Sequence, residues 1–338
     1  MILNALSITV VVVDLLTVVL LGWSGAKALR HYFRLRPNPA PHERLQVEDQ
    51  STLLFSLTVT VLIIRLFNWP FFYFTLASFI PQINGAMCLF GVTQVQGSLT
   101  LFEELIKPFG FFLIGGWLIL HRLDRATDTG PLLKPKLLFL AFLSMVVLAE
   151  GIGELILFLS LSPTFPVSCC TTVTDILSRP TSTLPQSLLG PAYKTLLEIL
   201  YFSLQGTLIA LCLYTARAIK GQPPAGRKRL LLPGMVLLSL FNAVTFLLVY
   251  IESFAPRFMD LPFHHCLYCL WQIVPGSILL FLFFILGTMA PGWAWMVDLL
   301  GREGEAEALT PRYLKALLLF SAGSLAASLG LTLFLLLK

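Results

Sequence analysis

Apolar residues run along this chain in long, nearly unbroken stretches that polar residues interrupt at intervals. Eight of these stretches have about 20 residues or more, which lets a helix cross the roughly 30 Å apolar core of a bilayer. They cover residues 5–24, 52–79, 100–121, 137–162, 191–216, 231–254, 267–290 and 313–337. The pattern predicts an all-α, polytopic transmembrane helical bundle of about eight spans, with residues 1–338 forming one transmembrane domain.

Local signals mark some of the span boundaries. Thr310 and Pro311 suit the N-cap and first turn of the last helix, because the N–H group that proline lacks would be unpaired there anyway. The start of the third span is less defined, since residues 102–108 also fit an interfacial turn. Glu103 and Lys107 lie in this stretch, and they are expected to form an ordinary i,i+4 pair at the outer boundary.

Composition agrees with a membrane protein, and charge predicts its orientation. Of the 338 residues, 57% are apolar and only 12% are charged, which is far from the balance of a soluble domain. The segments that follow the first, third, fifth and seventh spans, counted with the first turn of the last span, hold 17 of the 23 Lys and Arg residues. Because basic loops stay on the cytoplasmic side, both termini are expected on the outer, periplasmic side of a bacterial cytoplasmic (inner) membrane. The net charge of +5 therefore describes topology and contact with the lipid bilayer, and no nucleic-acid partner is expected.

Five of the six cysteines fall on the predicted outer side. They lie in loops 80–99, 163–190 and 255–270, which are expected to form an ordered cap: Cys88, Cys169, Cys170, Cys266 and Cys269. Cys212 lies near the inner end of a span, where a small buried hydrophobic role is expected. An oxidising compartment favours disulfides, so structural bridges between these loops of a transporter or complex subunit are one interpretation.

A compact motif, Phe-His-His-Cys-Leu-Tyr-Cys, occupies residues 263–269. Cys266 opens the seventh predicted span, so helix N–H groups and the neighbouring histidines favour a thiolate there. A thiolate is both the nucleophile of disulfide exchange and a ligand for soft metals. Covalent haem attachment is excluded, because Leu270 stands where that motif needs a histidine.

The first function that fits this motif is thiol-disulfide exchange. Cys266 and Cys269 would exchange with a periplasmic thiol protein, as in a membrane thiol-disulfide oxidoreductase. A second set of cysteines, drawn from Cys88, Cys169 and Cys170, would relay electrons to a quinone or to another subunit of a membrane complex.

The second function is binding or transport of a soft metal or metallocofactor. His264, His265, Cys266 and Cys269 offer the imidazole and thiolate ligands that zinc or copper prefers. Glu252, at the outer end of the sixth span, is expected as a carboxylate behind one of the histidines. A metal site at the outer face would also suit the entry of a transport path.

Ionisable residues inside the spans are costly and mark either pairs or pathways. Asp14 and Arg65 lie near the middle of the first and second spans, where a buried structural ion pair is expected. Glu150 and Glu154 lie one helical turn apart in the fourth span, and two such carboxylates do not both ionise cheaply without compensation. They are expected either to form a proton or ion path or to pair with Arg65.

Overall fold

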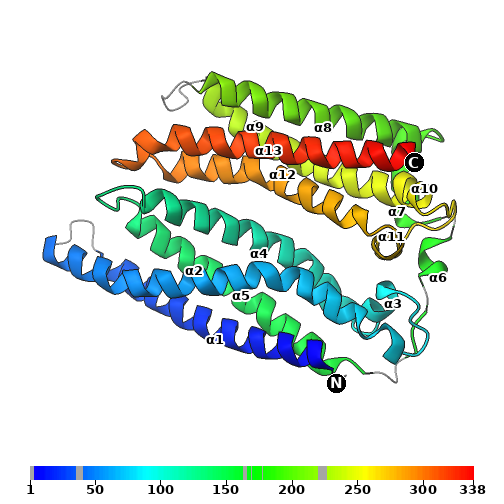
Figure 1. Cartoon of the computed structure of the whole chain (residues 1–338), viewed down its shortest axis with the longest axis horizontal. Helices are drawn as coiled ribbons and strands as arrows, with labels where there is room; N and C mark the ends of the chain where they lie inside the picture. Colours follow the sequence, from blue (N-terminus) through cyan, green and yellow to red (C-terminus); the bar gives the residue numbers. More distant parts are fainter. Residues whose placement is uncertain (1–3, 36–40, 163–165, 169, 177, 220–226) are drawn as a thin grey trace. The chain divides into compact units, whose positions relative to one another are not determined.

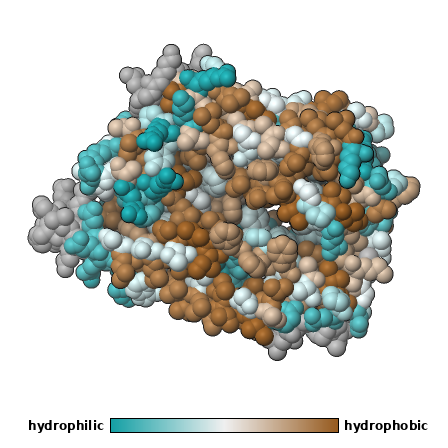
Figure 2. Space-filling model, in the orientation of Figure 1, coloured by the Kyte–Doolittle hydropathy of each residue, from teal (hydrophilic) through white to brown (hydrophobic). Residues whose placement is uncertain are grey.

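The computed structural model describes the chain except residues 1–3, 36–40, 163–165, 169, 177 and 220–226, and describes only the backbone of residues 41–46 and 227–230. The described residues form helices and no strands, which confirms the all-α class. Among these described residues, eight helices are long and apolar enough to cross a membrane, as the apolar pattern predicts. Apolar side chains cover their outward faces (Figure 2), which suits contact with lipid.

Two compact units make up the chain. Unit 1 consists of Met1–Val167 with Glu303–Ala306, and unit 2 consists of Ser168–Arg302 with Glu307–Lys338. Each unit is built around four of the long helices (Figure 1). The single transmembrane domain expected over the whole chain stays a prediction, as do the outer position of the termini and the bacterial inner membrane.

Unit 1 is assembled from neighbouring antiparallel helices. Its long helices are α1 (Ala5–Arg34), α2 (Pro41–Ala77), α4 (Gly97–Asp124) and α5 (Leu133–Ser160), and its short ones are η1 (Ile80–Gln82) and α3 (Leu89–Gln94). A capping box starts α1, because Asn4 accepts from the Ser7 backbone at 2.8 Å and the Ser7 hydroxyl accepts from the Asn4 backbone at 2.9 Å. Helix α5 packs against both α1 and α4, and α1 also packs against α2. Gly25 permits the close approach of α1 to α5, since a Cβ there would lie 2.5 Å from Cβ of Ser144.

Unit 2 has its own set of helices. The long ones are α8 (Tyr193–Ala218), α9 (Arg227–Val249), α12 (Gly276–Leu300) and α13 (Ala306–Leu337). Helix α9 continues through a π-helical turn, η2 (Tyr250–Phe254), into α10 (Ala255–Phe258), and the remaining short helices are α6 (Thr171–Thr174), α7 (Pro180–Leu189) and α11 (Leu267–Ile273). Buried polar contacts join its long helices, as where Gln205 accepts from Asn242 at 2.7 Å and donates to the carbonyl of Leu325 at 3.2 Å.

The seventh span differs from its expected bounds of residues 267–290. The helix is interrupted between α11 and α12, where Val274 has a non-helical conformation with φ −123° and ψ 76°. The physical reason is Pro275, because a residue that precedes proline is pushed away from helical geometry. Cys266 therefore precedes a helix of seven residues rather than a membrane-crossing one, and the expected effect of a long helix dipole on this thiol is wrong.

Candidate functional site

A cluster of three cysteines lies in unit 2. Cys170 immediately precedes α6, Cys266 immediately precedes α11, and Cys269 lies within the first turn of α11. Their Sγ atoms all lie within 4.8 Å of one another, and Sγ of Cys170 is 3.7 Å from Sγ of Cys269. Cys170 and Cys266 are only 2% exposed, and Cys269 is 9% exposed. These thiols could hold a metal ion.

His264 lies beside this cluster, and Asp175 orients its ring. Nε2 of His264 is 3.8 Å from Sγ of Cys170, while its Nδ1 is 2.8 Å from Oδ1 of Asp175. The same oxygen of Asp175 accepts a 2.8 Å hydrogen bond from the Thr174 hydroxyl, which fixes the carboxylate at the end of α6. When Nδ1 donates its proton to Asp175, the lone pair on Nε2 is directed away from that carboxylate and toward Cys170. Metal-binding histidines are commonly oriented by a carboxylate in this way.

Two separations in this cluster match those between the ligands of one tetrahedral ion. With Zn–S bonds of about 2.3 Å and a Zn–N bond of about 2.1 Å, two sulfurs lie about 3.8 Å apart, and sulfur and nitrogen lie about 3.6 Å apart. The observed values are 3.7 Å for the Cys170–Cys269 sulfur pair and 3.8 Å for the Cys170–His264 pair. The chemistry of the set, three thiols and one imidazole, is that of a zinc site. We name Cys170, His264, Cys266 and Cys269 the Cys3His cluster.

The two adjacent histidines have different partners. Nδ1 of His265 lies 2.8 Å from the carbonyl oxygen of Ile251, so His265 contacts η2, the π-helical turn that follows α9. Burial holds the pKa of the His265 imidazole below its ordinary value, so the ring is kept neutral. Of the two expected imidazole ligands, the structure brings His264 to the sulfurs.

The expected role of Glu252 behind a histidine is wrong. Its carboxylate accepts from Arg179 at 2.9 Å, from the Thr181 hydroxyl at 2.6 Å and from the Tyr193 hydroxyl at 3.0 Å. The physical reason is the buried guanidinium of Arg179, which needs a counter-charge in its low-dielectric surroundings. Glu252, in η2, therefore joins the start of α7 to the start of α8.

The structure also describes Cys88 and Cys212. Cys88 is buried in unit 1 at the N-cap position of α3. Cys212 is buried in unit 2 and donates to the Ser321 hydroxyl at 3.4 Å, which agrees with its expected packing role. Cys169 lies outside the described residues, so its expected part in an electron relay stays a prediction. Between the cysteines that the structure describes, no two sulfurs are joined in a disulfide, so the predicted bridges are not formed among them.

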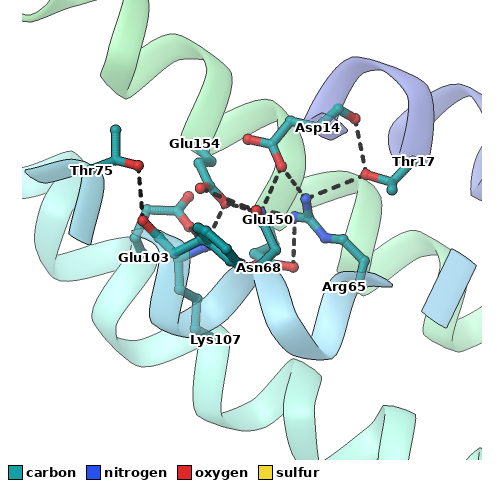
Figure 3. A network of polar contacts seen from close by, with 10 residues as sticks. Asp14, Thr17, Arg65, Asn68, Thr75, Glu103, Lys107, Glu150 and Glu154 are labelled. Carbon is teal, nitrogen blue, oxygen red and sulfur yellow. Dashed lines mark hydrogen bonds and ion pairs between the residues drawn. The ribbon is translucent and has the colours of Figure 1, made fainter. Parts of the chain in front are cut away.

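A second set of polar side chains is buried in the membrane-spanning part of unit 1 (Figure 3). Each long helix of the unit contributes to this buried charge network: Asp14 from α1, Arg65 and Asn68 from α2, Glu103 and Lys107 from α4, and Glu150 and Glu154 from α5. Its six charged side chains are between 0% and 9% exposed. Groups at such depth are expensive to ionise alone, so their mutual contacts decide their charges.

Lys107 lies among three carboxylates. Its Nζ is 2.6 Å from Oε2 of Glu154, 2.9 Å from Oε1 of Glu150 and 3.2 Å from Oε2 of Glu103. The ammonium also lies over the ring of Phe72, 4.4 Å from its centroid. Three carboxyl groups therefore share this single cation.

Arg65 is shared in the same manner. Its guanidinium forms an ion pair with Asp14, the pair expected from the sequence, and lies 2.9 Å from Oε2 of Glu150 and 3.8 Å from Oε2 of Glu154. Asn68, one helical turn along, donates to Oδ1 of Asp14 at 2.8 Å and to Oε2 of Glu154 at 3.3 Å. The expected pairing of Glu150 and Glu154 with Arg65 is thus present, together with Lys107 as a second cation.

Two glycines beside the glutamates of α5 make room for these contacts. A Cβ at Gly153 would lie 2.4 Å from Oε1 of Glu103, and a Cβ at Gly151 would lie 2.4 Å from Cγ2 of Val18 and 3.3 Å from a guanidinium nitrogen of Arg65. Residues without a Cβ are therefore needed where side chains from α4 and α1 reach α5. The local sequence Glu-Gly-Ile-Gly-Glu folds into a helix that offers two carboxylates and space for their partners.

Glu103 and Lys107 are the members of the network that the sequence prediction missed. The region from residue 97 onward is regular helix rather than an interfacial turn, and it places both side chains in the interior of unit 1, Glu103 at 0% and Lys107 at 2% exposure. The signal that could have identified them is the charge of the neighbouring spans. Two carboxylates in the fourth span and one in the first exceed the single positive charge of Arg65, so a further buried cation was needed.

In comparisons with protein families, curated proteins and solved structures, nothing matches this chain. Function is therefore inferred from the two clusters themselves.

Proposed function

We propose that this multi-pass membrane protein binds zinc through the Cys3His cluster of unit 2. The observation that carries this proposal is the position of Sγ of Cys170, which is 3.7 Å from Sγ of Cys269 and 3.8 Å from Nε2 of His264, as expected for ligands of one tetrahedral ion. Asp175 supplies the carboxylate that orients the histidine. The set of ligands is soft, which favours zinc or Cu(I) over magnesium or calcium.

The role that fits this site is to hold the loops of unit 2 together. Four protein ligands leave no open position for a substrate, which is typical of structural zinc rather than catalytic zinc. The burial of the sulfurs agrees with a closed site. The ion would join residue 170 to residue 264, which are 94 positions apart, and closing a loop of that length removes much freedom from the unfolded chain.

Thiol-disulfide exchange is a second candidate for the same cysteines, and the structure favours it less. An attacking thiolate must be reached by the disulfide of its partner, whereas Cys266 is 2% exposed and Cys269 is 9% exposed. A periplasmic thiol protein, a quinone and other subunits of a membrane complex stay predictions. Transport of the metal also stays a prediction.

Metal content tests the proposal directly. The full-length protein, purified in lipid nanodiscs and dialysed against metal-free buffer, is expected to retain about one zinc ion per chain by elemental analysis. The variants Cys170→Ser, Cys266→Ser and Cys269→Ser are each expected to lose most of it. Cys212→Ser is the matched control, because Cys212 is equally buried in unit 2 but lies outside the cluster.

Alkylation of the denatured, unreduced protein separates the two candidates. Full labelling of Cys170, Cys266 and Cys269 without a reductant, together with zinc that a chelator removes from the intact protein, supports metal binding. If these cysteines resist labelling until a reductant is added, while zinc is absent from the intact protein, metal binding is wrong and disulfide chemistry replaces it.

A further inference from the structure

We propose that unit 1 contains a proton-binding site within the membrane, in which Asp14 and Glu103 each carry a proton while Glu150 and Glu154 stay ionised. The ligand is the proton itself, taken from water at the membrane surface to form an O–H bond on each carboxyl group. This inference concerns unit 1 alone and is independent of the metal proposed for unit 2.

The charge of the buried network gives the number of protons. Its side chains include four carboxylates and only two cations, Arg65 and Lys107, so full ionisation would leave two uncompensated negative charges away from water. Each such charge is far more costly to bury than a neutral carboxyl group. Two bound protons bring the charge of the network from −2 to zero.

The contacts of the carboxylates indicate where the protons lie. Glu150 contacts both cations at 2.9 Å, and Glu154 lies 2.6 Å from Lys107 and 3.8 Å from Arg65. Asn68 donates both to Asp14 and to Glu154, so its hydrogen bonds do not distinguish the two. Asp14 and Glu103 stand at opposite ends of the network, and each has one cation that it shares with both central glutamates. The central pair is therefore compensated best when it carries the negative charge.

Unmatched oxygen atoms agree with this assignment. Oδ2 of Asp14 and Oε1 of Glu103 are both buried, and among the described residues neither has a hydrogen-bond partner. A buried carboxylate oxygen normally accepts at least one hydrogen bond. The two ends of the network are thus the places where a carboxyl group is more stable neutral than charged.

A proton fits this site better than a metal ion does. Carboxylate oxygens of Glu103, Glu150 and Glu154 lie within 4.8 Å of one another, as around a cation. The position among them is already held by the ammonium of Lys107, at 2.6–3.2 Å from all three. A second cation at that point would meet strong repulsion from the first.

Glu103 is placed to exchange its proton with the surface. It lies six residues after Gly97, the first residue of α4, so at 1.5 Å per residue it is about 9 Å from the helix end. Asp14 lies nine residues into α1, at about 14 Å. The charged and titratable groups that face Glu103 are Lys107 on α4, Glu150 and Glu154 on α5 and Tyr73 on α2. Arg65 and Asp14 lie at the other end of the network.

Infrared spectroscopy of the full-length protein in nanodiscs tests the proposal. The wild type is expected to show the carbonyl band of protonated carboxylic acids at about neutral pH, and this band is expected to fade as the pH rises. Asp14→Asn and Glu103→Gln should each halve it, and the double variant should abolish it. Glu104→Gln is the matched control, since it removes the adjacent half-buried carboxylate of α4 and should leave the band unchanged.

Stability distinguishes this assignment from simple charge counting. An amide replaces a neutral carboxyl group closely, so the Asp14→Asn/Glu103→Gln double variant should keep the unfolding temperature of the wild type. The Glu150→Gln/Glu154→Gln double variant should lower it clearly, because the partners of Lys107 are lost. A wild type without the band, a sodium-dependent stability in its place, or an equal loss of stability in both double variants would overturn the proposal.

Discussion

Replacement of Lys107 by methionine tests whether the buried charge network obeys charge balance. Methionine keeps the length and the packing over Phe72 but removes the positive charge that three carboxylates share. The network must then take up one more proton, on a group that the wild type keeps ionised. At pH 7, protonating a glutamate with the ordinary pKa of about 4.3 costs about 3.7 kcal/mol, at about 1.36 kcal/mol per pH unit.

This value lies in the range of about 3–5 kcal/mol that is lost when one partner of a buried ion pair is removed. It would lower the ratio of folded to unfolded protein by a factor on the order of 500, since about 1.4 kcal/mol is tenfold in an equilibrium constant. Because the extra proton is easier to acquire in acid, the loss should shrink as the pH falls, by about 1.4 kcal/mol per unit.

Equilibrium unfolding in mixed micelles, followed by far-UV circular dichroism at several pH values, measures this loss. Lys134→Met is the matched control, because Lys134 is an exposed residue at the start of α5 and lies 5.5 Å from the Tyr32 ring. Lys134→Met should change the free energy of unfolding by no more than about 0.5 kcal/mol. A loss below about 1 kcal/mol for Lys107→Met, or a loss that does not change with pH, would refute the charge-balance reasoning.

Three further predictions concern other contacts. Gly153→Ala should destabilise the protein by about 1–3 kcal/mol, because its Cβ would lie 2.4 Å from Oε1 of Glu103. Gly206→Ala is the control: no atom lies within 4 Å of its Cβ, so it should be neutral or stabilising in the same unfolding assay. Asp175→Asn should weaken zinc binding by about 10–100-fold in a competition titration with a chromophoric chelator, and an unchanged affinity would exclude His264 as a ligand. Arg179→Met should cost about 3–5 kcal/mol in unfolding measurements, because the Glu252 carboxylate is left buried without a counter-charge, and addition of Glu252→Gln should restore part of the loss.

The fold was predictable because the membrane imposes a simple rule on sequence. Backbone groups in lipid must be paired within a helix, so each long apolar stretch has one available structure. Each of the eight stretches contains one of the long helices found among the described residues. The break at Val274 and Pro275 was also readable, since the effect of proline on the preceding residue is local, but the apolar run on both sides concealed it.

The sites were predictable only in part, because the spacing of residues along the sequence does not determine the direction in which each side chain points. His264 and His265 are adjacent, yet one faces Cys170 and the other the backbone at Ile251. The pairing of Asp14 with Arg65 followed from their similar depth in neighbouring spans. Glu103 and Lys107 were missed because an i,i+4 pair looks the same on a surface as in an interior.

The positions of the charges along unit 1 also have a consequence for how the chain enters the membrane. A charged side chain at the centre of an inserting helix costs about 2.5–3.5 kcal/mol. Asp14 and Arg65 lie on successive long helices, which can enter as a hairpin with their charges paired, and Glu103 and Lys107 lie four residues apart on one helix.

Helix α5 differs, because its two glutamates have only the cations of other helices as partners. It is also the last of the four to be synthesised. When α5 leaves the ribosome, both Arg65 and Lys107 are already in the bilayer. The order of synthesis therefore lets each carboxylate of α5 pair with a cation as it enters.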